Sequence, residues 1–379
     1  MYDLVIRNGK IVDGSGEASF MGDIAIKGDR IVKIGLVEDK GNKEIDAEGN
    51  LVTPGWVDIH THYDGQVCWD EYLTPSCWHG VTTVVMGNCG VGFAPVKPGT
   101  EEFLVQLMEG VEDIPGVALN EGVSWDWESF PEYLDSIGKK NYAMDIGAMI
   151  GHGPIRSYVM GMDRCQGKEE ASDDEIDEMA RITKEAIEAG ALGFSTSRTY
   201  LHRDKFGEYV PGTEATAKEM RKIANTIADL GQGTLEIVSD WMDQDIELDW
   251  VKEFVEKSDR TLTYAQTGGN PVETWKYCEE NFSKGVKIRP QFPGRPTGML
   301  FSLESTVHPF IAHPSYGEIA DKTLEEKVAI MKGESFRQKI LSEEPAVDKN
   351  HMIYTLMMSF DKQFPMNEIP DYEPSYEES

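Results

Sequence analysis

The chain of 379 residues has few basic residues, few cysteines and no long apolar run. Lys and Arg number 36 against 67 Asp and Glu, which gives a formal net charge of −31. A surface of this sign repels phosphate groups, so the composition argues against nucleic acid and anionic membranes as partners. The five cysteines are odd in number and scattered, which argues against a disulfide framework and favours a reducing compartment. No run approaches the ~18 apolar residues of a membrane-spanning helix, and no secretory signal pattern is visible, so we expect a cytoplasmic protein.

The two ends of the sequence differ in pattern from its middle. Residues 1–52 contain short β-branched runs separated by turn signals such as Asn8-Gly9 and Gly28-Asp29, which predict a small β domain built from hairpins. Residues 346–379 are acidic and rich in proline, and they predict a tail with little helix or strand.

The middle of the chain alternates between short apolar runs and helical segments. The predicted strands are 56–59, 82–86, 144–150, 191–195, 234–238, 261–264 and 286–288. The predicted helices are 172–189, which begins with a capping box at Ser172, then 217–230, 246–256 and 271–282. Such alternation predicts a parallel sheet, and polar residues after the strands favour an α/β fold of the TIM-like (β/α) barrel type over 53–345. A doubly wound sheet is less favoured, since no Gly-x-Gly-x-x-Gly follows a strand.

His60 and His62 form the strongest chemical signal in the sequence. They follow the apolar run 56–59 and lie two residues apart. In an extended chain, residues two apart point to the same face, so both imidazoles can reach one metal ion. A pair of this kind also arises by chance, and the apolar strand before it and the loop after it favour the metal role without establishing it.

Cys89 lies in a glycine-rich loop, Gly87-Asn88-Cys89-Gly90, directly after the second predicted strand. Glycine lets a backbone approach a ligand or a metal closely. The cysteine is a candidate thiolate ligand or nucleophile, although a free cysteine is most often only a packed, buried residue.

Further polar residues follow later strands and are candidates for binding substrate. His152 and His202 are imidazoles placed after the third and fourth predicted strands. Arg198, Arg289 and Arg295 are candidate clamps for a carboxylate, because a guanidinium binds a carboxylate through two parallel hydrogen bonds. Surface ion pairs and packed histidines are the alternatives at these positions.

Taken together, these motifs resemble the amidohydrolase superfamily and, within it, the N-acyl-D-amino-acid deacylase (D-aminoacylase) branch. The resemblance is carried by the opening hairpins, the His60-Thr61-His62 segment, the loop around Cys89, the Gly-His-Gly turn at His152 and the run Gly190–Ser197. It implies a distorted TIM barrel beside a small β domain, and Zn²⁺ or another divalent metal held by His60, His62 and Cys89. It also implies hydrolysis of a non-peptide C–N bond by metal-activated water, with a small N-acyl amino acid as the substrate.

The sequence also departs from the family pattern. The family has histidines at the ends of the fifth and sixth strands, where this chain has Ser239-Asp240 and Ala265-Gln266. The catalytic Asp expected after an eighth strand is not found, so the catalytic residue is unknown and we expect it beyond Ser379. The last barrel strand and the C-terminal strands of the β domain are expected there too. A seven-stranded barrel has open edges, which predicts a homo-oligomer or a completing C-terminal segment.

Two functions follow from these observations. The first is deacylation of N-acyl-D-amino acids by a metal-dependent hydrolase. The alternative is a catalytically inactive fragment or degenerate amidohydrolase that binds a ligand without turnover, which the missing histidines and Asp favour. Cyclic-amide opening with two metals is argued against, because no Lys ends the fourth strand to bridge them.

Overall fold

The structure is a computed structural model of residues 1–379. It describes residues 1–167, 169–241, 243–266, 272–294, 298, 300–305, 308–347, 349, 354, 357–369, 371 and 375–379. They form two compact units, one of Met1–Tyr264 and Tyr277–Arg289 and the other of Ala265–Lys276 and Pro290–Ser379. Among the helices of the described residues, none is both long and apolar enough to cross a membrane.

The N-terminal residues form a small β sheet. Its strands are β1 (Tyr2–Ile11), β2 (Phe20–Lys27), β3 (Arg30–Gly35), β4 (Gly41–Asp46) and β5 (Leu51–Val52). The order is β3-β2-β1-β4, with β5 also paired to β1. Strands β1 to β3 form antiparallel pairs, whereas β4 and β5 run parallel to β1. Val5, Ala25 and Val37 form its buried core.

The turn expected at Asn8-Gly9 is wrong. Strand β1 continues through these residues, and its register with β2 shifts between Ile6 and Gly9. Asn8 adopts a φ of 56°, which asparagine tolerates better than most residues. The signal that predicted a chain reversal therefore marks an irregularity inside one strand.

The main sheet has seven strands and confirms the predicted α/β class. The strands are β6 (Trp56–Asp58), β7 (Val81–Met86), β8 (Asp145–Gly151), β9 (Gly193–Arg198), β10 (Thr234–Ser239), β11 (Leu262–Ala265) and β12 (Ile288–Gln291). They lie in the sequence order β6 to β12, and each neighbouring pair from β6 to β11 is parallel. Parallel strands in chain order place all their C-terminal ends at one edge, where residues far apart in the sequence meet.

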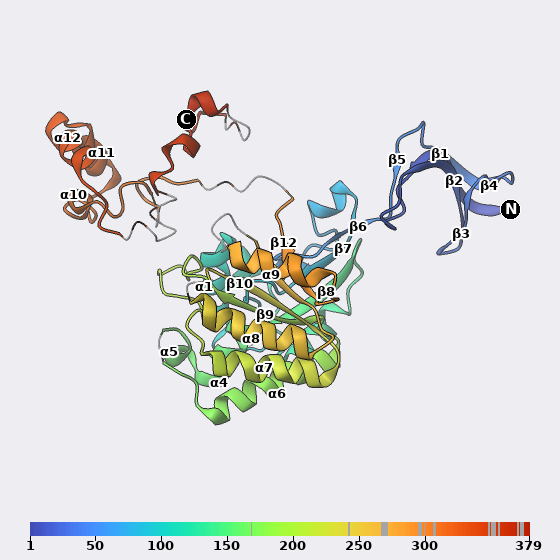
Figure 1. Ribbon diagram of the computed structural model, residues 1–379, viewed down its shortest axis with the longest axis horizontal. Coiled ribbons are helices and arrows are strands. Elements are labelled where there is room, and N and C mark those ends of the chain that lie inside the picture. Colours follow the sequence, from blue (N-terminus) through green and yellow to red (C-terminus); the bar gives the residue numbers. More distant parts are fainter. Residues whose placement is uncertain are drawn as a thin grey trace. The chain divides into compact units, whose positions relative to one another are not determined.

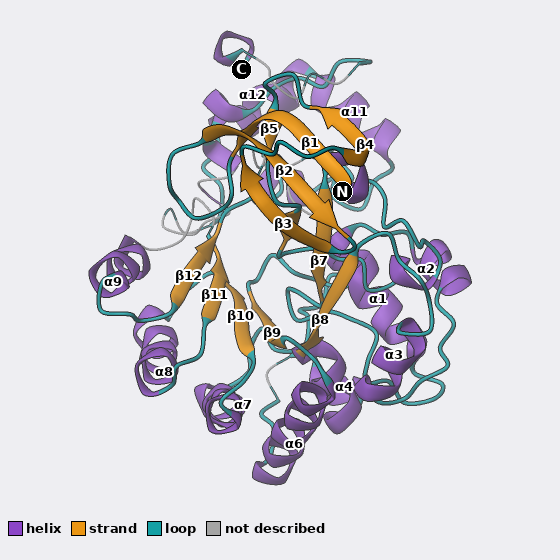
Figure 2. Cartoon of the chain, turned by 90° about the vertical axis from the view of Figure 1, so that its right-hand side faces the viewer, coloured by secondary structure: helices purple, strands orange, loops and turns teal. Residues whose placement is uncertain are grey.

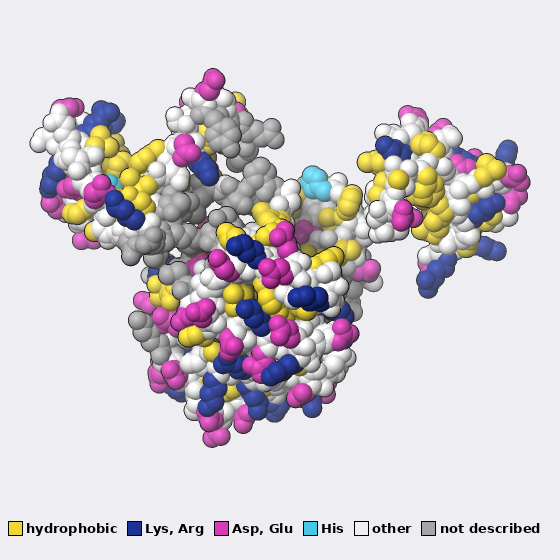
Figure 3. Space-filling model, viewed as in Figure 1, with side chains coloured by type: hydrophobic (Ala, Val, Ile, Leu, Met, Phe, Trp, Pro, Cys, Tyr) yellow, Lys and Arg dark blue, Asp and Glu magenta, His cyan; other side chains and the backbone are white. Residues whose placement is uncertain are grey.

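Helices pack along the outside of this sheet, as Figures 1 and 2 show. They are α1 (Glu101–Glu112), α2 (Gly116–Gly122), α3 (Phe130–Ile137), α4 (His152–Met160), α5 (Met162–Cys165), α6 (Asp173–Ala189), α7 (Ala217–Leu230), α8 (Gln244–Lys257) and α9 (Val272–Phe282), with 3₁₀ turns at Gln66–Cys68 and Ser76–His79. The four predicted helices match α6 to α9, and Ser172 makes the expected capping box with Glu175. Over the face that Figure 3 shows, acidic and basic side chains are intermixed on these helices.

Among its described residues, the second unit includes short helices. They are α10 (Pro314–Gly317), α11 (Leu324–Lys332) and α12 (Glu334–Ser342), followed by 3₁₀ turns at Phe360–Lys362 and Tyr376–Glu378. Tyr316, Ile319 and Ile340 form its small core. The domain boundaries expected at 52/53 and 345/346 stay predictions.

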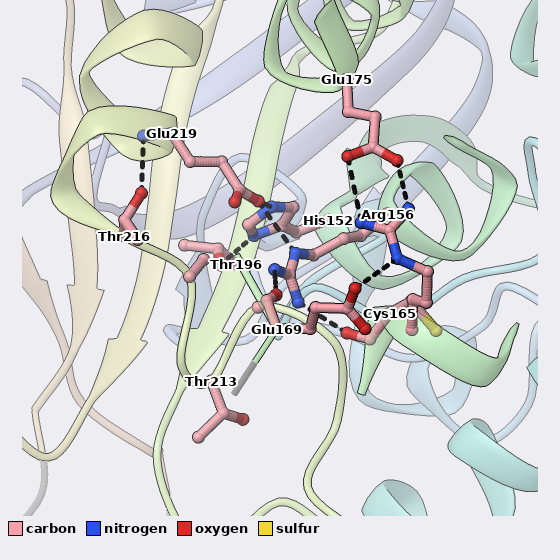
Figure 4. A network of polar contacts seen from close by, with 12 residues as sticks. His152, Arg156, Cys165, Glu169, Glu175, Thr196, Thr213, Thr216 and Glu219 are labelled. Atoms are coloured by element: carbon pink, nitrogen blue, oxygen red, sulfur yellow. Dashed lines mark hydrogen bonds and ion pairs between the residues drawn. The ribbon is translucent and has the colours of Figure 1, made fainter. Parts of the chain in front are cut away.

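A buried polar network ties α4 and α7 to the sheet (Figure 4). His152 contacts Thr196 on β9 at 2.8 Å through Nδ1 and Glu219 on α7 at 2.8 Å through Nε2. Arg156 donates to the same Glu219 oxygen at 3.1 Å and to the carbonyl of Cys165 at 2.6 Å. His152 and Glu219 are fully buried and Arg156 is 1% exposed, so the carboxylate compensates a cation that water cannot reach.

We expect Glu219→Ala to lower the free energy of unfolding by about 3–5 kcal/mol, because Arg156 would remain buried without its partner. Lys222→Ala, on the same helix, is the matched control. It removes an ion pair with Asp177 whose side chains are 48% and 64% exposed, so its cost should stay below about 1 kcal/mol. Urea unfolding of both variants measures the difference, and equal losses would contradict the assigned role of Glu219.

Candidate metal centre

Strand β6 leads directly into His60 and His62 at the C-terminal edge of the sheet. Thr61, which lies between them, donates its backbone N–H and its hydroxyl to the carbonyl of Val85 on β7, at 2.9 and 2.7 Å. The buried Asn88 amide donates to the carbonyls of Thr61 and Val85 at 3.2 and 3.0 Å. These bonds hold the segment against β7, and the two imidazole rings lie 5.4 Å apart between centroids.

The loop after β7 holds Cys89 in a left-handed backbone conformation with a φ of 56°. Three hydrogen bonds hold the loop in this shape. The N–H of Cys89 donates to Glu236 Oε2 on β10 at 3.1 Å, and the N–H of Gly90 donates to Ser195 Oγ on β9 at 3.0 Å. The Ser195 hydroxyl in turn donates to the carbonyl of Gly87. Groups from two later strands therefore fix the position of the cysteine.

The glycines of this loop serve close packing of backbone against backbone. A Cβ atom on Gly87, where φ is 79°, would lie 2.0 Å from the carbonyl oxygen of Met149 on β8. A Cβ atom on Gly90 would lie 2.8 Å from the amide nitrogen of Ser197 on β9. The close approach expected from these glycines is present, and its partner is the neighbouring strands.

The structure brings His60, His62 and Cys89 together. His60 Nε2 lies 3.2 Å from Cys89 Sγ, and one ligand atom from each of the three residues lies within 4.8 Å of the others. These spacings are close to those of ligands around one zinc ion, whose Zn–N and Zn–S bonds measure about 2.0–2.3 Å. The buried Nδ1 of His62 has no hydrogen-bond partner, while its Nε2 lies 3.2 Å from Glu112 Oε1. A histidine with one nitrogen on a carboxylate and the other unpaired fits a metal ligand.

Three carboxyl groups surround this cluster: Asp64 and Glu236 are buried, and the side chain of Glu112 is 19% exposed. Burial raises the pKa of Asp64 to about 7 and, together with Asp64 and Asp113, raises the pKa of Glu112 to about 8. Burial and Glu112 likewise raise the pKa of Glu236 to about 8. Asp64 Oδ2 and Glu236 Oε1 have no hydrogen-bond partner.

Burial and these acids also raise the pKa of the Cys89 thiol. Burial and nearby imidazoles hold the pKa of His62 well below its usual range, so this histidine is neutral, as a metal ligand must be. A divalent cation among these groups would reverse the balance and favour the thiolate and the carboxylates. The donor set therefore fits a divalent metal such as zinc.

The histidines expected to bind substrate have different surroundings. His202 lies beside the cluster: its Nδ1 is 2.9 Å from Ser197 Oγ, and burial together with His60 lowers its pKa to about 4. His152 is enclosed in the buried network with Thr196 and Glu219. A substrate role is compatible with the position of His202, whereas His152 has both ring nitrogens engaged within the protein.

The guanidinium of Arg198 is bound within the protein. Nε donates to Glu247 Oε1 at 2.6 Å, and Nη2 lies 2.5 Å from the same oxygen in an ion pair. Nη1 donates to the carbonyls of Gly212 and Ala215 at 3.2 and 2.8 Å. Arg289 donates to the carbonyls of Val286 and Ile288 and stacks on the ring of Phe282 at 4.8 Å. Arg295 lies outside the described residues. The carboxylate-binding role of all three stays a prediction.

Two residues of the site were missed by the sequence analysis. Glu236 lies within an apolar strand, and a carboxylate in such a run was a signal, since an acid is buried only where something compensates it. Glu112 is the last residue of α1 and reaches His62 only through the fold. Nothing in its local sequence distinguished it from the many other acids of this chain.

Comparison with known proteins agrees with this geometry. A model of the amidohydrolase family matches residues 43–352. D-aminoacylase of Alcaligenes xylosoxydans xylosoxydans is 32% identical over 229 residues, which cover 60% of this chain and 42% of that protein. The chain thus spans less than half the length of the curated relatives it matches.

Solved structures show the same fold. A crystal structure of D-aminoacylase matches with a TM-score of 0.64 at 24% identity, covering 91% of this chain and 70% of that one. N-acyl-D-glutamate deacylase from Bordetella bronchiseptica, solved with zinc and a phosphonate inhibitor, matches with a TM-score of 0.59 at 23% identity, covering 78% and 59%. The family match extends over most of the sequence and includes the strand ends that carry His60, His62 and Cys89, so the chain belongs to the amidohydrolase family.

Proposed function

We propose that this protein is a metal-dependent hydrolase that cleaves the amide bond of N-acyl-D-amino acids. The observation that carries the proposal is the meeting of His60, His62 and Cys89 at the C-terminal edge of the sheet, with ligand atoms within 4.8 Å of one another. The names of its relatives, D-aminoacylase and N-acyl-D-aspartate and N-acyl-D-glutamate deacylases, support linear N-acyl amino acids as the substrate class.

The three residues would hold Zn²⁺ or another divalent metal. Such an ion supplies Lewis-acid activation of an amide carbonyl and of water. Glu112 orients the ring of His62 through the contact at Nε2, which leaves Nδ1 for coordination. Glu236 holds the backbone of Cys89 and so keeps the sulfur facing His60.

We infer that His202, which lies beside His60, contacts the substrate. Its Nδ1 is engaged by Ser197, and its low pKa keeps the ring neutral near pH 7. A neutral imidazole can donate or accept one hydrogen bond, which suits contact with the polar end of a substrate. The cytoplasmic location, and the expected homo-oligomer or completing C-terminal segment, stay predictions.

A second candidate is binding of the same ligands without turnover. The ends of β10 and β11 carry Ser239 and Ala265, where the family resemblance leads one to expect histidines. The metal would then have fewer imidazole ligands than in the family, and hydrolysis could be lost while binding persists.

We expect Cys89→Ala to reduce bound zinc clearly, because it removes the only sulfur of the cluster. Cys165→Ala is the matched control, since Cys165 is fully buried but lies in the α5 segment, away from the three ligands. Metal analysis of both purified variants by mass spectrometry gives the stoichiometry. An unchanged zinc content in Cys89→Ala would remove this residue from the ligand set.

We expect the purified chain to release acetate from N-acetyl-D-amino acids, with much slower release from the L-enantiomers. Chelation should remove most of this activity and added Zn²⁺ should restore it, because activation of the amide carbonyl and of water depends on the metal. Assays of amine release with and without chelator test this. Zinc binding without turnover of any N-acyl amino acid would favour the second candidate.

A further inference from the structure

A cavity of about 270 Å³ opens at the C-terminal ends of β9 and β10. The residues lining it include Arg198, Tyr200, Glu214, Ser239, Asp243 and Glu247. It lies at the same edge of the sheet as the metal cluster, since Ser197 beside Arg198 contacts His202. Its size is slightly below the ~300–1,000 Å³ of complete small-molecule sites, so it suits one arm of a substrate.

The single cation of this lining is already neutralised. The Nε and Nη2 atoms of Arg198 contact Glu247, and its Nη1 donates to two carbonyl groups. An incoming carboxylate would have to displace Glu247 from a side-chain pair that is about nine-tenths buried on both partners. Among the described residues, the lining therefore offers no spare cation for an anionic ligand.

The charged groups that Arg198 leaves unbalanced in the lining are carboxylates. Glu247 is 5% exposed, and its Oε2 is buried without a hydrogen-bond partner. Glu214 Oε2 is likewise buried without a partner. Because Arg198 balances only Glu247, the acids Glu214 and Asp243 leave the lining with an excess of negative charge.

Two further features bear on the sign of the ligand. The N-terminus of α8 reaches this region and would by itself favour an anion, but Asp243 caps it by accepting the N–H of Ile246 at 3.3 Å. The ring of Tyr200 lines the cavity, and burial together with Glu214 raises the pKa of its hydroxyl. A neutral aromatic ring beside carboxylates is a favourable setting for an organic cation.

We propose that this cavity binds the side-chain ammonium group of the substrate, and thus selects N-acyl derivatives of basic amino acids such as lysine. The proposal rests on the proposed function for the identity of the rest of the ligand. The ammonium group would pair with the carboxylates of Glu214 and Asp243, whose charge Arg198 does not balance, and its alkyl chain would contact Tyr200.

Binding of uncleavable analogues by the full-length protein as purified tests the proposal. N-methanesulfonyl-D-lysine carries the ammonium group, whereas N-methanesulfonyl-D-norleucine has a similar shape without it, and neither contains a carboxamide to hydrolyse. By isothermal titration calorimetry we expect the lysine analogue to bind about tenfold more tightly, as charge-assisted hydrogen bonds imply. Equal affinities, or tighter binding of the corresponding glutamate analogue, would overturn the proposal.

Variants that neutralise one acid at a time test which carboxylates cause the preference for the lysine analogue. Glu214→Gln and Asp243→Asn should each reduce the preference for the lysine analogue several-fold and leave the affinity for the norleucine analogue unchanged. Glu208→Gln is the matched control, because Glu208 is an exposed acid of the same β9–α7 connection that is not among the cavity-lining residues. A preference that survives both cavity variants, or falls equally in the control, would contradict this assignment.

The outcome is separable from that of the proposed function. Selective binding that responds to Glu214 and Asp243, without hydrolysis of N-acetyl-D-lysine, would uphold the cavity and reject the hydrolase. Hydrolysis of neutral N-acyl-D-amino acids, with no preference for the lysine analogue, would do the reverse.

Discussion

The geometry of the site depends on one strained residue, Cys89, and on the contacts that hold it. A non-glycine residue in the left-handed region costs of order 1–3 kcal/mol and persists only where its surroundings impose it. Glu236 binds the N–H of Cys89, and Ser195 binds both sides of the loop through Gly90 and Gly87. These groups come from β10 and β9, so the sulfur reaches His60 only when the parallel sheet is assembled.

The buried charges of this protein fall into two kinds. In the network around Glu219, a cation and an acid compensate each other, and the imidazole of His152 completes their hydrogen bonds. Around Cys89, by contrast, the buried Asp64 and Glu236 and the partly buried Glu112 have no Arg or Lys among the contacts described for them. Their pKa values are raised to about 7, 8 and 8. A divalent ion held by His60, His62 and Cys89 would supply the counter-charge that makes this second arrangement favourable.

The ion pair between Arg198 and Glu247 changes what Arg198 can bind in the cavity. An arginine after a strand is a reasonable candidate for binding a substrate carboxylate, and the resemblance to deacylases makes that role attractive. In the fold the guanidinium is held by Glu247, and the atoms left over are carboxylate oxygens. The sign of the ligand that such a cavity prefers is therefore set by which groups remain unpaired, and composition cannot reveal this.

Local sequence patterns were sufficient for the elements of the main sheet. Six of the seven strands were anticipated from apolar runs, whereas the run 286–288 meets β12 (Ile288–Gln291) only at Ile288. Helix α7 was anticipated at its observed bounds, and the capping box at Ser172 has the expected partner. The same patterns identified His60, His62 and Cys89 as candidate ligands, because each follows closely after a strand. They misplaced a turn at Asn8, since a residue that tolerates positive φ can serve a reversal or an irregular strand equally well.

What the sequence determined by itself was the order of the strands of the main sheet and of helices α6 to α9, together with the residue types at the strand ends, because periodicity and capping act over a few neighbours along the chain. Only the tertiary structure decided that Glu112 contacts His62, that Glu236 holds Cys89 and that Arg198 is neutralised by Glu247. These pairs are separated by 49 to 147 positions in the sequence. Which polar groups meet over such separations depends on how the strands align. The sequence around each residue does not indicate its partner.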